Sequence, residues 1–245
     1  MKTLLPAERL IVAADFKPDS TQGRGWVHSQ VIQLARSLKG TGVYLKVNSA
    51  LRSYGYDLID EIHSFGLKVF ADLKLFDIGA TLAIDGVLLF ESKPEIVTTV
   101  CAAGIAALRA LKTELPDTEV LGVTVLTSLK DVETRAMFSC STEEAVMRCA
   151  HTAFDGQING LISSPQEAEV LRAKFGVVFS LNTPAIRPAW APVTGDDQNL
   201  KRAMTPAEAI KAGADRIVVG RPILQAENPY DAVMRTIDEI AAAMA

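Results

Sequence analysis

RLIVAADFKPDS, residues 9–20, is an apolar run typical of a buried strand, and it ends in a carboxylate, Asp15, with no glycine after it. An open, doubly wound sheet that binds a dinucleotide has a Gly-rich turn at this place, where the pyrophosphate approaches the backbone. A (β/α)₈ barrel instead gathers polar side chains at the carboxyl ends of its strands. The stretch therefore favours the barrel, and the doubly wound sheet is the structural alternative.

The same pattern continues along the chain. Short apolar runs alternate with stretches of helical periodicity, which is the rhythm of an α/β fold. We expect strands at 9–15, 43–48, 68–75, 95–101, 120–126, 160–164, 177–184 and 216–221. Eight strands, each followed by a helix, predict a single (β/α)₈ TIM barrel domain over residues 1–245.

Capping residues mark several of the expected helices. Gly66 ends one helical pattern, and Ser164 followed by Pro165 is a typical N-cap with proline at the first helical position. The helical patterns lie at 56–66, 164–176, 205–214 and 229–245. The longest irregular stretch, 185–204, is rich in proline and polar residues, and a loop of that length in a compact domain predicts a lid.

The bulk composition narrows the class of protein. The chain is 49% hydrophobic and 22% charged, with a formal net charge of −4, which argues against a general nucleic-acid or membrane-surface binder. No apolar run approaches the roughly 18 residues of a membrane span. Three cysteines without a CxxC pair fit a reducing compartment and suggest neither a disulfide framework nor a zinc site. We expect a cytoplasmic protein.

Three ionisable residues interrupt the apolar stretch VFADLKLFDIGAT, 69–81. Asp72 and Lys74 are two apart, so on a strand they share one face, and Asp77 falls at the start of the next helix. A structural ion pair with an N-cap would explain them. However, Lys46 and Asp15 also arrive at strand ends, and alternating charges keep lysines protonated and carboxylates ionised. The pattern predicts an active site that holds fixed charges without a metal and can deliver a proton.

The stretch RIVVGRPI, 216–223, gives a second signal. Gly220 lets backbone N–H groups approach phosphate oxygens, Arg221 offers a bidentate guanidinium, and the end of strand eight is the usual phosphate site of a barrel. Arg187, after the preceding strand, reaches the same corner. A strand-end glycine with a solvated arginine is the simpler alternative. Together the two arginines favour a phosphate site.

In its sequence motifs the chain resembles the orotidine 5′-phosphate decarboxylase family. The motifs that carry the resemblance occur in order over nearly the whole chain: LKV (45–47), DLKLFDIGAT (72–81), VTVLTS (123–128), TPAIRP (183–188), DDQ (196–198) followed by MTP (204–206), and VVGRPI (218–223). Each motif is weak alone, but the ordered set is specific. The resemblance implies decarboxylation of orotidine 5′-monophosphate to UMP and CO₂ without metal or cofactor.

The resemblance also implies a role for each matching residue. Lys74 protonates C6 of the pyrimidine, Asp72 lies beside the substrate carboxylate, and Lys46 orients Asp72 and the ribose. Asp77 and Thr81 enter the site of a neighbouring subunit, which implies a homodimer. The remaining substrate-binding set is Asp15 at the ribose, Thr127 at the pyrimidine, and Arg187, Gln198, Gly220 and Arg221 at the phosphate, with Gln198 on the lid.

A few positions depart from the family pattern. Ala80 stands where asparagine often precedes the threonine, and Cys101 stands at a frequent histidine position. Two rival functions stay open. Metal-dependent sugar-phosphate decarboxylases and synthases of the same suprafamily have an acidic metal ligand where this chain has Lys46, so a cation there would oppose Mg²⁺. A non-catalytic nucleotide-phosphate-binding barrel is the second rival.

Overall fold

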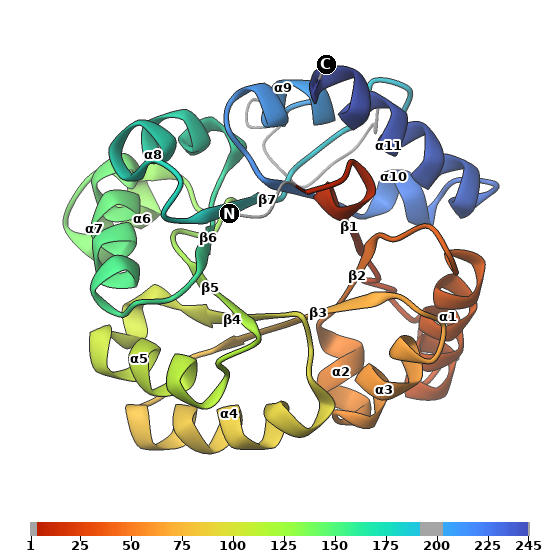
Figure 1. The fold of residues 1–245 in the computed structure, drawn as a ribbon, viewed down its shortest axis with the longest axis horizontal. Coiled ribbons are helices and arrows are strands. Elements are labelled where there is room, and N and C mark those ends of the chain that lie inside the picture. The colour runs from red at the N-terminus through yellow and green to blue at the C-terminus, as the bar shows by residue number, and fades with distance from the viewer. Residues whose placement is uncertain (1–3, 192–202, 245) are drawn as a thin grey trace.

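A closed barrel of parallel strands forms the centre of the molecule (Figure 1). The computed structural model describes residues 4–191 and 203–244, and in this part of the chain the strands follow one another in sequence order until β8 pairs with β1. The strands are β1 Leu10–Ala13, β2 Tyr44–Val47, β3 Lys68–Leu75, β4 Ile96–Val100, β5 Glu119–Val123, β6 Gly160–Ile162, β7 Ser180–Thr183 and β8 Arg216–Val219. The predicted (β/α)₈ barrel is confirmed, and the doubly wound alternative is wrong because the sheet closes on itself.

Helices surround the barrel on the outside, as Figure 1 shows. They are α1 Arg24–Ser37, α2 Ser49–Tyr54, α3 Asp57–His63, α4 Gly79–Ser92, α5 Ile105–Glu114, α6 Asp131–Phe138, α7 Thr142–Asp155, α8 Ala168–Phe175, α9 Pro206–Lys211, α10 Arg221–Leu224 and α11 Pro229–Met244. Short 3₁₀ turns lie at Ala7–Arg9, Cys101–Ala103 and Pro165–Glu167. This arrangement covers the outer face of the strands and leaves their carboxyl ends accessible.

The core has two parts because each strand is buried on both faces. Inside the barrel, a small cluster joins inward-facing side chains of six strands: Ile11, Ala13, Tyr44, Phe70, Ile96, Leu121 and Val218. A larger cluster lies between the barrel and the helices and contains the alternate strand residues, such as Val69, Ala71 and Leu73. Because both faces of each strand are buried, the strand sequences are nearly continuous apolar runs.

Seven of the eight strands are shorter than the sequence patterns predict, and only β3 has the predicted bounds; β6 and β7 show the reasons. The run 177–184 yields a strand only from Ser180, because Val177 and Val178 remain 68% and 57% exposed before the chain enters the barrel. The run 160–164 stops pairing at Ile162, because Ser164 already caps the following turn. The extent of a strand pattern in the sequence is therefore longer than the segment that pairs with its neighbours.

The predicted caps are present. Ser164 occupies the N-cap before Pro165, where its backbone N–H donates to Glu167 Oε2 at 2.9 Å; the first turn is 3₁₀ and the α-helix begins at Ala168. Thr205 accepts a hydrogen bond from the backbone N–H of Glu208 and opens α9. The α3 pattern ends at Gly66, whose φ of 75° lies in the left-handed region that glycine adopts without strain.

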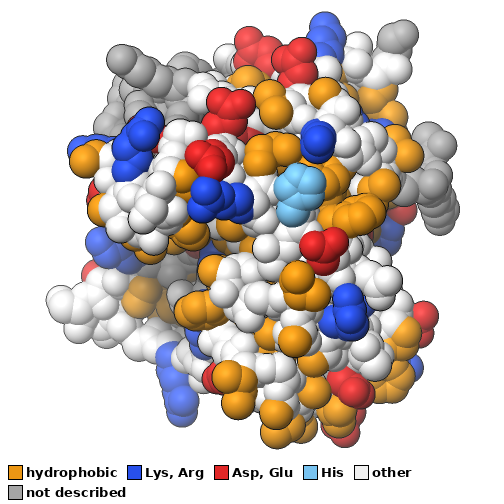
Figure 2. All heavy atoms as spheres, turned by 90° about the vertical axis from the view of Figure 1, so that its left-hand side faces the viewer, with side chains coloured by type: hydrophobic (Ala, Val, Ile, Leu, Met, Phe, Trp, Pro, Cys, Tyr) orange, Lys and Arg blue, Asp and Glu red, His pale blue; other side chains and the backbone are white. Residues whose placement is uncertain are grey.

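The face formed by α5 to α8, which Figure 2 turns towards the viewer, carries acidic, basic and apolar side chains interspersed. Such mixing is typical of a solvated surface. Among the described residues, none of the helices has both the length and the apolar content needed to cross a bilayer.

Candidate active site

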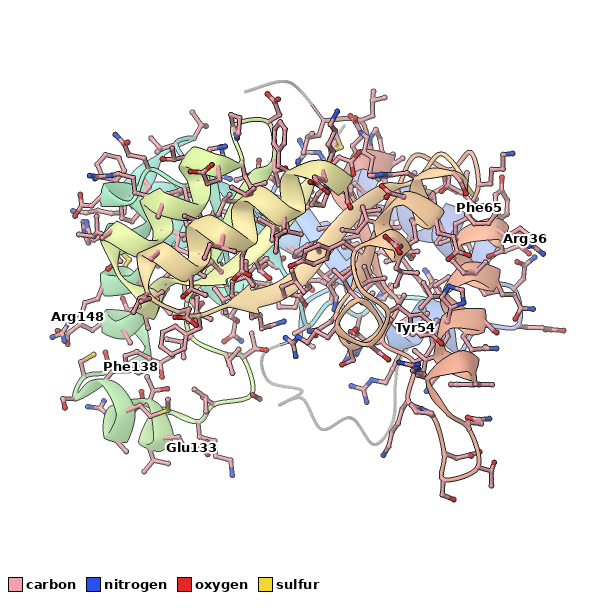
Figure 3. The ribbon with its side chains drawn as sticks, turned by 90° about the horizontal axis from the view of Figure 1, so that it is seen from below. Arg36, Tyr54, Phe65, Glu133, Phe138 and Arg148 are labelled. Atoms are coloured by element: carbon pink, nitrogen blue, oxygen red, sulfur yellow. The ribbon has the colours of Figure 1, made fainter. Side chains whose placement is uncertain are left out.

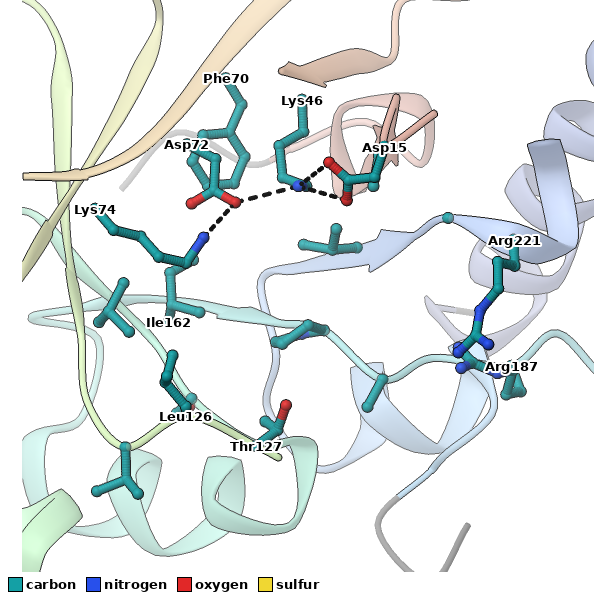
Figure 4. Close-up of a pocket in the computed structure, with 18 of the residues that line it drawn as sticks. Asp15, Lys46, Phe70, Asp72, Lys74, Leu126, Thr127, Ile162, Arg187 and Arg221 are labelled. Carbon is teal, nitrogen blue, oxygen red and sulfur yellow. Dashed lines mark hydrogen bonds and ion pairs between the residues drawn. The ribbon is translucent and has the colours of Figure 1, made fainter. Parts of the chain in front are cut away.

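The charged residues meet because the first three strands run in register. Ala13 pairs with Lys46 and Lys46 pairs with Phe70, so these inward-facing positions lie at one level of the barrel. Asp72 is the next inward residue of β3, and Asp15 follows the end of β1. The Nζ of Lys46 contacts Asp15 Oδ2 at 2.9 Å and Asp72 Oδ2 at 3.1 Å (Figure 4). The predicted convergence of charges at the carboxyl ends of the strands is observed.

Asp72 is the centre of this group and is only 6% exposed. Its Oδ2 accepts hydrogen bonds from Lys74 Nζ at 2.7 Å, Lys46 Nζ at 3.1 Å and Asn48 Nδ2 at 3.4 Å. Its Oδ1 accepts one from Thr98 Oγ1 at 2.9 Å. A carboxylate with this many donors is held both in place and in its ionised form.

The ionisation of Asp72 and of Lys46 follows from two opposing effects, burial and the charge of neighbouring groups. Burial by itself raises the pKa of Asp72, but the charges of Lys46 and Lys74 outweigh it and hold the pKa at about 2. Burial likewise lowers the pKa of Lys46, and the two carboxylates Asp72 and Asp15 outweigh it and raise the pKa above its ordinary value. At neutral pH the site therefore holds a fixed, alternating array of charges.

Lys74 reaches this array from an irregular part of β3. Its φ is 50°, a left-handed conformation that is uncommon outside glycine. The pairing of β3 with β4 passes from Ala71↔Val97 to Leu75↔Thr99, so β3 advances four residues while β4 advances two. Lys74 therefore lies on a bulge, and simple alternation along a regular strand does not fix the direction of its side chain.

A cavity of about 410 Å³ extends from the charged group across the carboxyl ends of the strands. Figure 4 shows Asp15, Lys46, Asp72 and Lys74 towards one end, and Arg187 and Arg221 at the other. It is lined by Ala13, Asp15, Lys46, Phe70, Asp72, Lys74, Val123, Val125, Leu126, Thr127, Ile162, Ser163, Pro184, Ala185, Arg187, Val218, Gly220, Arg221 and Leu224. Its size suits a small molecule of the dimensions of a nucleotide.

The end with the two arginines is built from β7 and β8. Gly220 follows β8, and Arg221 begins α10 directly after it. Arg187 follows β7, where its backbone N–H donates to the carbonyl oxygen of Met204 at 2.9 Å and so ties together the two described ends of the 185–204 loop. Gln198, the predicted lid residue, lies outside the described residues.

Asp77 and Thr81 are placed differently from the other predicted site residues. Neither lines the cavity, although Asp77 follows Lys74 by only three positions. Asp77 is exposed, and its Oδ1 accepts a hydrogen bond from the backbone N–H of Ile78 at 2.7 Å, just before α4. The chain turns away from its own cavity between Lys74 and Asp77.

Three polar residues near the site are absent from the sequence prediction. Thr98 and Asn48 contact Asp72, and the buried hydroxyl of Ser163 lines the cavity with no hydrogen-bond partner among the described residues. Asn48 and Ser163 directly follow strands, which gave a signal, but small polar residues are common there, and Thr98 lies in the middle of β4. Conversely Asn182, a polar residue near the end of the predicted strand 177–184, does not line the cavity, and its Nδ2 donates to Ser180 Oγ.

Comparisons with known proteins agree with this geometry. Residues 8–236 match the family model described as "Orotidine 5'-phosphate decarboxylase / HUMPS family". The orotidine 5′-phosphate decarboxylases of Afipia carboxidovorans and Syntrophus aciditrophicus are 39% and 36% identical to this chain. The alignments cover 97% of both chains for the first, and 96% of this chain and 93% of the relative for the second. The crystal structure of orotidine 5′-phosphate decarboxylase from Lactobacillus acidophilus superposes with a TM-score of 0.80 at 28% identity, covering 95% of this chain and 99% of that chain.

Proposed function

The chain belongs to the orotidine 5′-phosphate decarboxylase / HUMPS family, and we propose that it converts orotidine 5′-monophosphate to UMP and CO₂ in pyrimidine nucleotide biosynthesis. The observation that carries the proposal is the pairing of two buried or half-buried lysines with one buried carboxylate at the bottom of the cavity. That array faces two arginines at the other end of the same cavity.

The chemistry requires charge placed in advance. When the bond from C6 to the carboxylate breaks, CO₂ leaves and the electron pair stays on C6 in the ring plane, where the π system cannot delocalise it. The ammonium of Lys74, held 2.7 Å from Asp72, stabilises this negative charge and transfers a proton to C6. Lys74 then recovers a proton from water. Preorganised charge therefore replaces an electron sink.

The other cavity residues bind the rest of the nucleotide. Asp15 and Lys46 offer a carboxylate and an ammonium to the ribose hydroxyls, and Thr127 lies over the pyrimidine. Arg187, Arg221 and the backbone after Gly220 hold the phosphate, a dianion that guanidinium groups bind in a bidentate manner. Binding energy from this remote group positions C6 against Lys74.

A metal-dependent sugar-phosphate reaction fits these residues less well. The ammonium of Lys46, bonded to both Asp15 and Asp72, occupies the place between the two carboxylates where a divalent cation would sit. Within the described residues, no group of three or more histidine, cysteine, aspartate or glutamate side chains is arranged to hold a metal ion. We therefore propose a reaction without metal or organic cofactor. The cytoplasmic location stays a prediction.

The first test is turnover in the presence of a chelator. Purified protein in excess EDTA should convert orotidine 5′-monophosphate to UMP at the same rate as untreated protein, because lysine ammonium groups supply the charge that a metal would otherwise supply. The loss of orotidylate absorbance measures the rate. Turnover that stops in EDTA and returns with Mg²⁺ would contradict the metal-free mechanism, and binding without any turnover would support the non-catalytic barrel.

We propose further that the enzyme is a homodimer in which Asp77 and Thr81 complete the partner's cavity. The support is an apolar surface around these residues. It is formed by Phe76, Ile78, Ile84, Val87 and Leu88, which are 50–70% exposed. Exposed apolar groups on consecutive turns are typical of protein interfaces. In Figure 3 the helix α4, which carries three of them, lies across the face of the molecule towards the viewer.

Hybrid dimers test the shared site. Lys74→Ala and Asp77→Ala proteins should each be nearly inactive, and a mixture should regain up to about one quarter of wild-type activity, because half of the dimers are hybrid and each hybrid has one intact site of two. Activity is measured after the subunits have exchanged, with exchange followed by mass spectrometry of differently tagged chains. Exchange without any recovery of activity would show that Asp77 does not act across the interface.

A further inference from the structure

The bulge in β3 is opposed by a single residue of β4. Between the pairs Ala71↔Val97 and Leu75↔Thr99, three residues of β3 face only Thr98. A bulge of this kind leaves backbone groups without ladder partners, and bulges near active sites redirect side chains. Asp72 and Lys74 are both among the three residues, so the geometry of the catalytic pair depends on what holds the bulge.

The hydroxyl of Thr98 makes two hydrogen bonds to this bulge. Its Oγ1 accepts from the backbone N–H of Lys74 at 3.0 Å and donates to Oδ1 of Asp72 at 2.9 Å. The residue is fully buried, and it lies two positions after Ile96, whose side chain belongs to the cluster inside the barrel. One oxygen atom thus connects the carboxylate of Asp72 with the backbone from which the Lys74 side chain extends.

The direction of the bonds is fixed by this arrangement. An amide N–H only donates, so Thr98 Oγ1 must accept from Lys74, and its own proton is then directed to the ionised Asp72. This bond occupies Oδ1 and leaves Oδ2 for the ammonium groups of Lys46 and Lys74. The left-handed φ of 50° at Lys74 is likewise stabilised by the bond to its N–H.

We propose that Thr98 is a positioning residue for decarboxylation: its hydroxyl sets the orientation of Asp72 and the bulged backbone of Lys74 relative to C6 of the substrate. This inference rests on the proposed function of the site. Thr98 itself does not line the cavity and touches no reacting atom. Its contribution is to keep the ammonium of Lys74 aimed at one place, which matters because small displacements of a reacting group lower the rate steeply.

The test compares Thr98→Val with the wild type. Valine has the same shape but no hydroxyl, so kcat for orotidine 5′-monophosphate should fall about 100-fold, the scale expected for a displaced catalytic group. KM should change little because the arginine end of the cavity is untouched. The pKa of Asp72 should rise on loss of a bond to its charged form. The acidic limb of the profile of kcat/KM against pH should therefore move to higher pH.

A second pair of variants separates the hydroxyl from the side-chain volume. Thr98→Ser keeps the oxygen and Thr98→Ala removes it, while both lose the methyl group. Serine should restore most of kcat and the wild-type pH profile, and alanine should behave like valine. This pair also decides the question if the valine variant does not fold.

Thr99→Val is the matched control. Thr99 is equally buried on the same strand, and its Oγ1 donates to the carbonyl oxygen of Leu75 at 2.8 Å, so valine there also removes one hydroxyl bond to β3. It should leave kcat and the pH profile unchanged. A folded Thr98→Val protein with wild-type kcat, or equal loss in the serine and alanine variants, would overturn the inference. A wild-type protein without turnover would instead overturn the proposed function.

Discussion

Replacing Lys74 with alanine is expected to lower kcat by about 10⁴-fold or more, the largest effect of any single substitution proposed for this chain. The residue combines two contributions: proton delivery, which is worth about 10²–10⁴-fold, and electrostatic stabilisation of developing charge, which is worth about 10²–10³-fold. Lys46, the other lysine that lines the cavity in the described part of the chain, cannot replace it because it is held between Asp15 and Asp72. The rate is followed by the loss of orotidylate absorbance.

Lys68→Ala is the control for this substitution. Lys68 lies on the same strand but at its opposite end, where its Nζ pairs with Glu8 Oε1 at 2.6 Å. Its replacement should leave kcat unchanged. UMP binding by the Lys74→Ala protein, measured by calorimetry, should persist because the phosphate end is intact. A Lys74→Ala protein that keeps more than about a tenth of wild-type kcat would remove Lys74 from the role of proton donor.

Asp72→Asn is expected to lower both activity and stability. Without the carboxylate, Lys46 and Lys74 lose their common partner, and kcat should fall by about 10³-fold or more as the Lys74 ammonium is no longer fixed. Breaking a buried ion pair on one side costs about 3–5 kcal/mol of unfolding free energy. We expect about 3 kcal/mol, the lower end of that range, because the side chain of Lys74 is 31% exposed and water can solvate it.

The pH dependence of this stability difference has a defined sign. The folded pKa of Asp72, about 2, lies below its ordinary value of 3.8, so the stabilisation is present above pH 3.8 and is lost as the pH falls towards 2. The gap in urea midpoint between wild type and Asp72→Asn should therefore be constant near neutrality and narrow below pH 4. A gap that widens on acidification would contradict the assignment of Asp72 as an ionised group.

Asp215→Asn separates activity from stability. Asp215 is also a partly buried carboxylate in an ion pair, with Arg172 at 2.6 Å, and it accepts the backbone N–H of Leu181 at the other end of the barrel. Its replacement should lower the urea midpoint without lowering kcat. Loss of kcat in this variant to the extent seen for Asp72→Asn would mean that the activity loss reports only on destabilisation.

Sequence periodicity was sufficient for the barrel but not for the details of its strands. Eight apolar runs at regular spacing predict eight strands because buried parallel strands have no polar face to break the pattern. The sequence pattern starts β7 too early because the apolar residues Val177 and Val178 precede the paired strand, and it ends β6 too late because it includes Ser163 and Ser164. Composition cannot distinguish a paired valine from an exposed one.

The charged residues of the cavity were likewise only partly predictable from the sequence. The sequence alone was enough to predict that Asp15, Lys46 and Asp72 lie close together, because strand ends converge in any barrel. Thr98 and Asn48 could not be assigned, since a buried threonine on a strand has no chemical signature of its own. Their roles follow from which strand lies next to which, and from the register between β3 and β4.

By itself, the sequence determined which elements form, which faces are apolar and which residue types are available for the chemistry, because these depend on local periodicity and on the nature of each side chain. Only the tertiary structure decided the bulge at Lys74, the bond from Thr98 and the turn that carries Asp77 away from its own cavity. These features depend on non-local register and closure, in which residues 24 or more positions apart are brought within hydrogen-bond distance.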